Sequence, residues 1–280
     1  MKELFELCGK DGGKVVIESF GARILLESDS RDSLEMALGR ARKALLGRIK
    51  ILDSSEEANV NHRFGLVRDE DGVWCLIENG RRRNGGGSEF VLFKYFDAIL
   101  RLRVAENATD WVFIHAGVIA WNGRAVIVPA GSYKGKTTLV AELLRYGAVY
   151  YSDEYAVLDR SGLVHPFPRD LTIRGIGNPA RQSSIPAGDF GGQVGRRPIP
   201  IGVVLLTEYR EGAKWDPTEL TVGQGIMETI PHTIPLHIST EFSLEVLNKA
   251  CKGAIIAKSF RGDAGADSPE ILRFLDKYLV

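Results

Sequence analysis

Cysteine, net charge and long apolar stretches are all scarce in this sequence of 280 residues. The three cysteines, Cys8, Cys75 and Cys251, lie far apart and form no C-x-x-C motif, which excludes a disulfide framework and a cysteine-based metal site. No apolar run approaches the roughly 18 residues that a membrane-spanning helix needs. Lysine plus arginine and aspartate plus glutamate both number 36, and this zero net charge argues against a general nucleic-acid or acidic-membrane binder.

The start of the chain also lacks the apolar core of a signal peptide, because Lys2, Glu3 and Glu6 place charges there. We therefore expect a cytoplasmic protein whose cysteines are reduced and buried. The composition, with 44% hydrophobic and 26% charged residues, is that of a globular protein able to bury a sizeable core.

The length is large for one domain and comfortable for two. The apolar pattern breaks between residues 105 and 110, where we place the domain boundary. Residues 1–108 mix strand and helix patterns and predict a small α+β domain, a candidate for recognition of a substrate or partner. Residues 109–280 alternate strands, loops and helices, which is typical of an α/β domain.

Apolar periodicity predicts strands at residues 15–17, 23–26, 73–77, 112–120, 124–128, 149–158, 171–174 and 201–206. It predicts helices at residues 31–46, 90–106, 136–146, 241–252 and 268–279. For the last helix, Ser268 is the expected N-cap and Pro269 the expected first helical residue. Residues 175–200 are rich in Gly, Pro and Ser and predict irregular chain, with residues 187–197 as a lid or binding loop.

Residues 130–137 match the phosphate-binding loop G-x-x-x-x-G-K-[ST], with Ala130 in place of the first glycine. The strand and the helix that this motif requires are both predicted, one on each side. Lys136 is positioned to reach the β- and γ-phosphates of a nucleotide, and the Thr137 hydroxyl to ligate Mg²⁺. The alternative is a surface turn that matches by accident. The candidate nucleotide-binding residues are Ala130, Gly131, Ser132, Tyr133, Lys134, Gly135, Lys136, Thr137 and Thr138.

Two adjacent acids, Asp153 and Glu154, follow in a mostly apolar segment that predicts a strand. Because a buried charge is costly unless it is paired or bound to metal, we expect them to hold Mg²⁺ or to take a proton from an attacking hydroxyl. Two solvated acids at a strand edge are the alternative. Arg174, at the start of a glycine-rich turn, suits phosphate binding and equally suits a surface position.

The histidines and the run of arginines at residues 81–83 give weaker signals. His115 stands among apolar residues before the loop-feeding strand, where a lone histidine is usually a satisfied core residue. The arginine run predicts an exposed turn, with contact to phosphate or an acidic peptide as the alternative. No other histidine has a companion at metal-ligand spacing, and we interpret these as structural or surface residues: His62, His165, His232 and His237.

Together these motifs resemble the catalytic domain of the bacterial HPr kinase/phosphorylase family over roughly residues 111–210. The matching pieces are His115 with Gly117, the phosphate loop, the acidic pair and residues 173–177. The resemblance implies a phosphate-loop kinase core of the type shared with phosphoenolpyruvate carboxykinases, which is a mixed sheet with flanking helices. Thr172 stands where the family usually has a glutamate, and Glu154 where it usually has a second aspartate.

The resemblance also implies roles for individual residues. Lys136 would bind phosphate, Asp153 would be the base for a serine hydroxyl, and Glu154 would be a metal-binding or orienting acid. His115 would lie beside the transferred phosphate, with Arg174 as a further candidate for charge neutralisation. The implied metal ligands are Thr137, Asp153 and Glu154.

The leading hypothesis is an ATP- and Mg²⁺-dependent kinase that phosphorylates a serine hydroxyl of a peptide or small protein. The chain looks most like stand-alone relatives found with peptide-modifying pathways, some of which phosphorylate a serine of a precursor peptide. A kinase for a small-molecule hydroxyl is one alternative, and a nucleotide-binding regulatory module without transferase activity is another. We expect no nucleic-acid or membrane partner, and the closed oligomers of the resembling family leave a homo-oligomer open.

Overall fold

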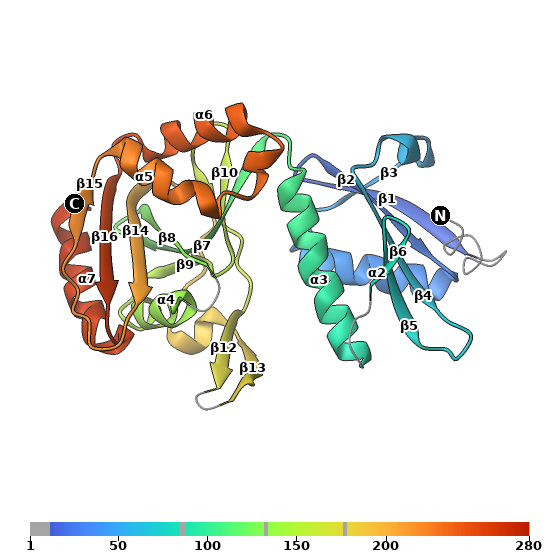
Figure 1. Ribbon diagram of the computed structural model, residues 1–280, viewed down its shortest axis with the longest axis horizontal. Coiled ribbons are helices and arrows are strands. Elements are labelled where there is room, and N and C mark those ends of the chain that lie inside the picture. The colour runs from blue at the N-terminus through green and yellow to red at the C-terminus, as the bar shows by residue number, and fades with distance from the viewer. Residues whose placement is uncertain (1–11, 84–87, 132–133, 176–177, 280) are drawn as a thin grey trace. The chain divides into compact units, whose positions relative to one another are not determined.

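The computed structural model describes residues 12–83, 88–131, 134–175 and 178–279. The chain divides into two compact units, Met1–Asp110 and Trp111–Val280. The sequence had placed this division between residues 108 and 109. Both units combine helices with a mixed sheet (Figure 1). None of the helices in the described ranges is both long and apolar enough to cross a membrane.

The first unit is built on a six-stranded sheet in the order β3-β1-β2-β4-β5-β6. Neighbouring strands are antiparallel except β2 and β4, which run parallel. The elements are β1 (Gly13–Ser19), β2 (Ala22–Ser28), α2 (Arg31–Ala44), β3 (Lys50–Leu52), η1 (Ser54–Asn59), β4 (His62–Arg68), β5 (Trp74–Glu78), β6 (Arg81–Arg83) and α3 (Glu89–Glu106).

Helices α2 and α3 start where a serine side chain accepts a backbone N–H of the first turn, at Ser30 and Ser88 respectively. Their apolar faces pack against alternate residues of the strands, among them Ile24 and Phe64. Burial of this apolar surface supplies most of the driving force for folding the unit.

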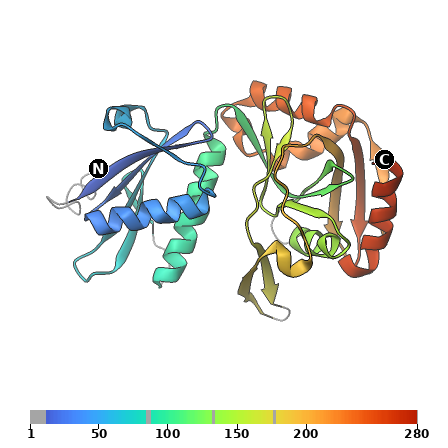
Figure 2. The same ribbon diagram turned by 180° about the vertical axis from the view of Figure 1, so that it is seen from behind.

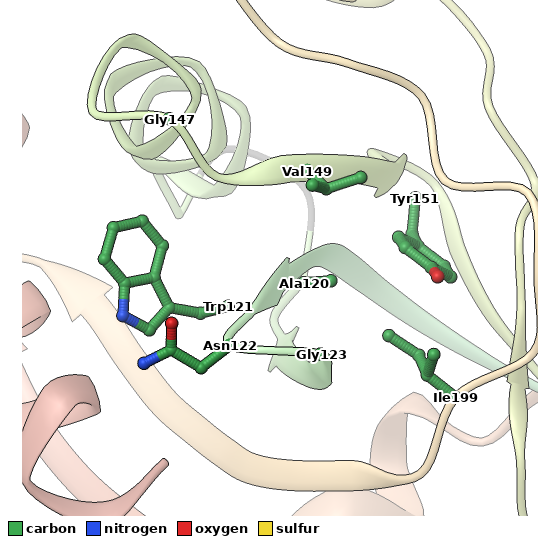
Figure 3. A pocket seen from close by; sticks show the side chains of 8 residues that line it. All are labelled: Ala120, Trp121, Asn122, Gly123, Gly147, Val149, Tyr151 and Ile199. Carbon is green, nitrogen blue, oxygen red and sulfur yellow. The ribbon is translucent and has the colours of Figure 1, made fainter. Parts of the chain in front are cut away.

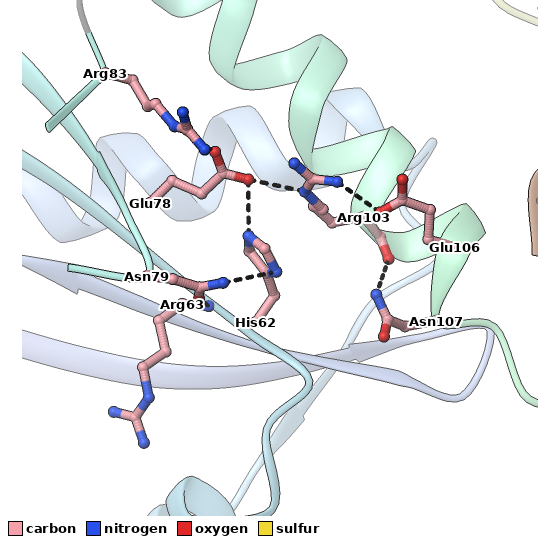
Figure 4. Close-up of polar contacts among 8 residues, drawn as sticks. All are labelled: His62, Arg63, Glu78, Asn79, Arg83, Arg103, Glu106 and Asn107. Carbon is pink, nitrogen blue, oxygen red and sulfur yellow. Dashed lines mark hydrogen bonds and ion pairs between the residues drawn. The ribbon is translucent and has the colours of Figure 1, made fainter. Parts of the chain in front are cut away.

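A buried carboxylate joins the sheet to α3 in this unit (Figure 4). Glu78, which is 2% exposed, accepts hydrogen bonds from His62 Nε2 at 2.9 Å, Arg83 Nε at 2.7 Å and Arg103 Nε at 2.8 Å. Burial raises the pKa of Glu78, but the hydrogen bonds from Arg103 and His62 outweigh it and hold this pKa below its ordinary value. His62 was expected to be structural, and it lies here as a member of a satisfied polar network.

The second unit contains an eight-stranded sheet in the order β11-β10-β7-β8-β14-β16-β15, with β9 also paired to β7. Strands β8, β14 and β16 are parallel, and the other pairs are antiparallel. The strands are β7 (Trp111–Trp121), β8 (Arg124–Pro129), β9 (Val149–Ser152), β10 (Tyr155–Asp159), β11 (Val164–His165), β14 (Ile201–Tyr209), β15 (Thr218–Leu220) and β16 (Ile255–Arg261).

Helices cover both faces of this sheet (Figures 1 and 2). On one face, α4 (Lys136–Arg145) and α7 (Ala264–Tyr278) pack through Leu139 and Ile271. On the other, α5 (Val222–Thr229) and α6 (Thr240–Cys251) pack through Ile226 and Leu247. The short helices η3 (Ile230–His232) and η4 (Ile234–His237) connect α5 to α6. The expected α/β architecture is therefore present.

Several boundaries differ from the sequence-based expectations. The region expected as one strand at residues 149–158 is two strands, because Ser152 Oγ accepts the N–H groups of Glu154 and Tyr155 and holds a bend there. Asp153 and Glu154 lie in that bend. Helix α7 starts at Ala264, since the Asp263 side chain caps the N–H groups of Gly265 and Ala266. The expected N-cap at Ser268 is therefore wrong, and Pro269 lies inside the helix.

The glycine-rich region also holds regular structure that the sequence did not predict. Strand β12 (Leu171–Gly175) pairs with β13 (Asn178–Ile185) as a separate two-stranded sheet beside α4 (Figure 1). The short helix η2 (Ala187–Phe190) follows, where an irregular lid or binding loop was expected. The two cysteines in the described ranges, Cys75 and Cys251, are free and buried, as expected. Cys8 lies outside those ranges.

Candidate functional site

The motif at residues 130–137 joins the end of β8 to the start of α4, at the edge of the sheet where β8, β14 and β16 also end. Gly135 is the N-cap of α4 with φ 79°, in the left-handed region that favours glycine, and no side chain caps the helix. The first N–H groups of α4 are thus left for a ligand, and a helix N-terminus attracts anions. Ser132 and Tyr133 lie outside the described residues.

Lys136, the first residue of α4, is 8% exposed. A Cβ atom at Gly117 would lie 3.0 Å from Lys136 Cγ and 2.7 Å from Val140 Cγ2, so only glycine on β7 leaves room for this lysine stem. Burial lowers the pKa of Lys136, while the charges of Asp153 and Glu154 raise it. A buried ammonium group at the loop is suited to bind a phosphate oxygen.

Asp153 lies directly beside the motif. Thr137 Oγ1 donates a hydrogen bond to Asp153 Oδ2 at 2.8 Å, and Asp153 Oδ1 is buried without a hydrogen-bond partner. Burial raises the pKa of Asp153 to about 6, although the hydrogen bond from Thr137 and the charge of Lys136 lower it. An unpartnered buried carboxylate oxygen is costly, which points to a ligand that satisfies it.

Glu154, the second expected metal ligand, forms an ion pair with Arg169 Nη1. Its backbone carbonyl accepts the N–H of Ala116 on β7, at 3.2 Å. The two acids thus have different partners. Asp153 faces Thr137, whereas Glu154 binds Arg169, which was not among the candidate residues predicted from the sequence. No local spacing connects Arg169 to Glu154, and only the fold brings the two together.

His115 lies on β7 opposite Tyr155 of β10, and its backbone carbonyl accepts the N–H of Ala130 at 3.3 Å. Burial, and next the charge of Lys136, lower the pKa of His115 to about 4. The imidazole is therefore neutral at pH 7 and able to donate one N–H without adding charge.

His232 had been interpreted as a structural or surface residue, yet it lies close to the same groups. An isolated antiparallel bridge between Ile114 and Thr233 places η3 along β7, next to His115. Burial, followed by the charge of Lys136, lowers the pKa of His232, and the charge of His232 in turn lowers that of His115. This proximity depends on long-range strand pairing, so the sequence offered no signal for it.

The remaining candidates lie at the rim or are only partly described. Lys134 is exposed and binds Glu208 Oε2 through Nζ at 2.9 Å, and Thr138 is exposed on α4. Arg174 lies on β12, but its side chain is outside the described part of the structure. The backbone of Thr172 on the same strand also lowers the pKa of Asp153. Hairpin β12–β13 therefore starts beside the site.

The protein also has a pocket of about 320 Å³ that lies elsewhere in the second unit (Figure 3). It surrounds the turn between β7 and β8, at the opposite end of these strands from Ala130, and side chains of β9 complete it. Its lining is Ala120, Trp121, Asn122, Gly123, Gly147, Val149, Tyr151 and Ile199, none of them among the candidate residues. The pocket and the candidate residues thus lie in different places. The polar groups that converge at Lys136 and Asp153 make the stronger candidate for a functional site.

The donor set at the motif fits Mg²⁺. Within the described ranges no three His, Cys, Asp or Glu side chains are grouped so as to hold a metal ion. Mg²⁺ is commonly bound through one or two carboxylates together with substrate phosphates and water. The unpartnered Asp153 Oδ1 and the adjacent Thr137 hydroxyl are hard oxygen ligands of the right kind.

Comparison with known proteins finds no family model that matches this chain and no curated protein with a matching sequence.

Proposed function

We propose that this chain is a kinase that transfers the γ-phosphate of ATP to a hydroxyl group and requires Mg²⁺. One observation carries the proposal: the Thr137 hydroxyl of the phosphate motif donates to Asp153 at 2.8 Å, beside the buried Lys136. A phosphate-binding helix start, a buried cation and a half-satisfied carboxylate in one place are the parts that phosphoryl transfer needs. The proposal includes the phosphate-loop kinase core that the motifs resemble.

Each group at the site has its own role in this reaction. The N–H groups at the start of α4 and the ammonium of Lys136 hold the phosphates and offset their negative charge. Thr137 and Asp153 would hold the metal ion, which when bound neutralises charge on the phosphates. His115, neutral at pH 7, would donate its N–H to an oxygen of the transferred group.

Asp153 is also the proposed base. Without bound metal its pKa is about 6, close to neutral pH, where a base is mostly ionised yet still strong enough to accept a proton. In-line transfer would then need mainly correct positioning of the acceptor hydroxyl against the phosphate. A protein serine in a peptide or small protein is our leading acceptor, on the strength of the family resemblance, ahead of a small-molecule hydroxyl. We also infer a cytoplasmic location and leave a homo-oligomer open.

A nucleotide-binding regulatory module is the second candidate, and two observations favour it. The Glu154 carboxylate is bound to Arg169, and Thr172 stands at the position where the resembling family has an acid. Only Asp153 is then left as a carboxylate facing the motif, so a second carboxylate ligand for the metal is missing among the described residues. Such a site would bind nucleotide and transfer phosphate poorly.

Mass spectrometry distinguishes these candidates. The purified protein is incubated with ATP and Mg²⁺ and, separately, with a pool of serine-containing peptides and a pool of small hydroxyl compounds. We expect one acceptor class to gain the mass of a phosphoryl group, and Lys136→Met to abolish that gain. ATP binding without transfer to any member of either pool would favour the regulatory module.

A further inference from the structure

Arg261 is a fully buried arginine that the phosphate motif and the proposed reaction do not account for. It is the last residue of β16 and is 2% exposed. Nη2 donates a hydrogen bond to the carbonyl of Gly135 at 2.6 Å, and Nη1 donates to the carbonyl of Gly262 at 3.0 Å. Nε is buried and has no hydrogen-bond partner. The charged side chain at the end of β16 thus reaches the phosphate motif, which follows the end of β8.

The charge of Arg261 has no direct counter-ion among the residues described. The charges of Asp267 and Asp263 raise its pKa through space, but both carboxylates accept backbone N–H groups, Asp267 from Gly262 and Asp263 from Gly265. Burial lowers the pKa of Arg261, but a guanidinium stays charged in proteins. A buried charge without an ion-pair partner is costly even when it is hydrogen-bonded, so a bound anion nearby would stabilise Arg261.

The contacts of the motif show where that anion would lie. The N–H of Tyr209, at the end of β14, donates to the carbonyl of Lys134 at 3.2 Å, next to the Arg261 bond to Gly135. In a trans peptide the C=O and the following N–H point in opposite directions. β14 holds the Lys134 carbonyl, and Arg261 holds the Gly135 carbonyl together with the N–H of Leu139, which lies 3.1 Å from it. The N–H groups of Gly135 and Lys136 therefore point away from these contacts, as an anion-binding concavity requires.

Gly135 itself is adapted to this contact. A Cβ atom there would lie 2.6 Å from Arg261 Nη2, closer than any side chain tolerates, and 3.2 Å from Tyr209 Cβ. The glycine therefore serves two needs, a left-handed backbone and the close approach of the guanidinium.

We propose that Arg261 is a positioning residue of the phosphate motif. It fixes the Gly135 carbonyl so that the following N–H groups face the ligand, and its positive charge acts on a bound di- or triphosphate through the intervening peptide groups and not by direct contact. The assignment rests on the proposed function only in that an inorganic or nucleotide polyphosphate binds at the motif. It is independent of transfer and of the acceptor.

Binding of inorganic pyrophosphate tests this assignment without any phosphoryl transfer. Calorimetric titration is done on the full chain and on Arg261→Met, Arg261→Lys and, as a matched control, Arg273→Met, which removes an exposed arginine of α7 paired with Glu270. We expect Arg261→Met to weaken binding about ten-fold or more, since the bonds to the carbonyls of Gly135 and Gly262 and a buried positive charge are all lost. Arg273→Met should bind as the unaltered protein does.

The lysine variant separates positioning from a merely structural role. Lys keeps the charge but not the fork that joins the two carbonyls, so Arg261→Lys should remain weakened while staying folded. It carries the test alone if Arg261→Met fails to fold. Millimolar guanidinium added to the methionine variant should restore part of the pyrophosphate affinity, and in a transfer assay KM for ATP should rise with little change in kcat.

Two results would overturn the assignment. If both Arg261 variants bind pyrophosphate as tightly as the unaltered protein and lose only thermal stability, Arg261 merely secures the end of β16. If the unaltered protein binds neither pyrophosphate nor ATP, the proposed function fails and the role of Arg261 fails with it. Weakened pyrophosphate binding in a protein that transfers no phosphate would uphold Arg261 and remove only the kinase activity.

Discussion

Asp153 and His115 are neighbours of Lys136, and the fold shifts their pKa values in opposite directions. Burial raises the pKa of Asp153 to about 6 and lowers that of His115 to about 4, so both side chains favour their uncharged forms. The folded protein without nucleotide thus disfavours a charge on either side chain, and burial acts on Lys136 in the same sense. Each shift is also a statement about stability, because the unfolded chain binds the same protons with ordinary affinity.

Asp153→Asn should make the nucleotide-free protein more stable at pH 7. The folded carboxyl binds its proton more tightly than the unfolded one, so the stability it contributes is complete below about pH 4 and is lost as the pH rises to about 6. The asparagine variant lacks this loss, which is worth up to about 3 kcal/mol for a shift of about two pKa units. Urea unfolding between pH 4 and 7.5 measures it. A constant difference between the two proteins at every pH would contradict the shift.

His115→Gln should show the reverse dependence on pH. The folded imidazole resists protonation, so the stability it contributes is complete above pH 6.5 and is lost as the pH falls to about 4. The unaltered protein should therefore lose stability relative to the glutamine variant over this range, by up to about 3 kcal/mol. The same unfolding series reports the effect, and parallel curves for the two proteins would show that His115 is not desolvated.

At the scale of elements, the phosphate motif is held from outside by the ends of two strands. β14 holds the carbonyl of Lys134 through the Tyr209 N–H, and β16 holds that of Gly135 through Arg261. The parallel order of β8, β14 and β16 brings these ends to one edge of the sheet. Ligands of α/β sheets commonly bind at the carboxyl ends of the strands, and this edge has that location.

Gly135→Ala and Gly147→Ala form a matched pair that isolates the contact with Arg261. Both glycines have positive φ, 79° and 95°, so both variants incur backbone strain of about 1–2 kcal/mol. A Cβ atom at Gly147 meets nothing within 4 Å, whereas at Gly135 it meets Arg261 Nη2 at 2.6 Å. The Gly135 variant should therefore be the less stable in urea unfolding, and the excess should shrink in an Arg261→Met background. Equal losses in both variants would contradict the proposed contact.

Much of this element-level structure follows from the sequence, but the contacts that complete the site do not. The strand, turn and helix around Lys136 were predictable because residue periodicity and the motif act over short range. The bend at Asp153 was missed, since its cause is a single hydrogen-bonding serine, Ser152. Arg169, His232 and Arg261 reach the site through contacts between segments that are distant in sequence, and no local pattern encodes such contacts.

At the scale of the whole molecule, each unit has its own core and its own polar centre. In the first unit Glu78 joins β4, β6 and α3 through His62, Arg83 and Arg103 (Figure 4). In the second, the described candidate residues all lie on elements between β7 and η3. No buried side-chain atom of His62, Glu78, Arg83 or Arg103 lacks a hydrogen-bond partner. We therefore assign this network a structural role.

Glu78→Gln should destabilise the protein by about 2–3 kcal/mol, because it leaves two arginines without a buried counter-ion. It should leave nucleotide affinity unchanged, since the site is built from the second unit. Glu106→Gln is the control, as it also binds Arg103 but is 17% exposed and should cost less. Thermal unfolding measures the loss of stability, and calorimetric titration with ATP and Mg²⁺ measures the nucleotide affinity. A weakened nucleotide affinity in Glu78→Gln would show that the first unit contributes to the site.

The most direct test of the central claim is to measure ATP binding and phosphoryl transfer in the same preparations of the unaltered protein and Asp153→Asn. The amide keeps the size of the side chain and an acceptor for Thr137, but it cannot take the proton of a hydroxyl. We expect Asp153→Asn to bind ATP with an affinity within about ten-fold of the unaltered protein and to lose transfer by about a hundred-fold or more. Transfer that is the same in both proteins, or absent from both while ATP binds, would contradict a phosphoryl-transfer site built on Asp153.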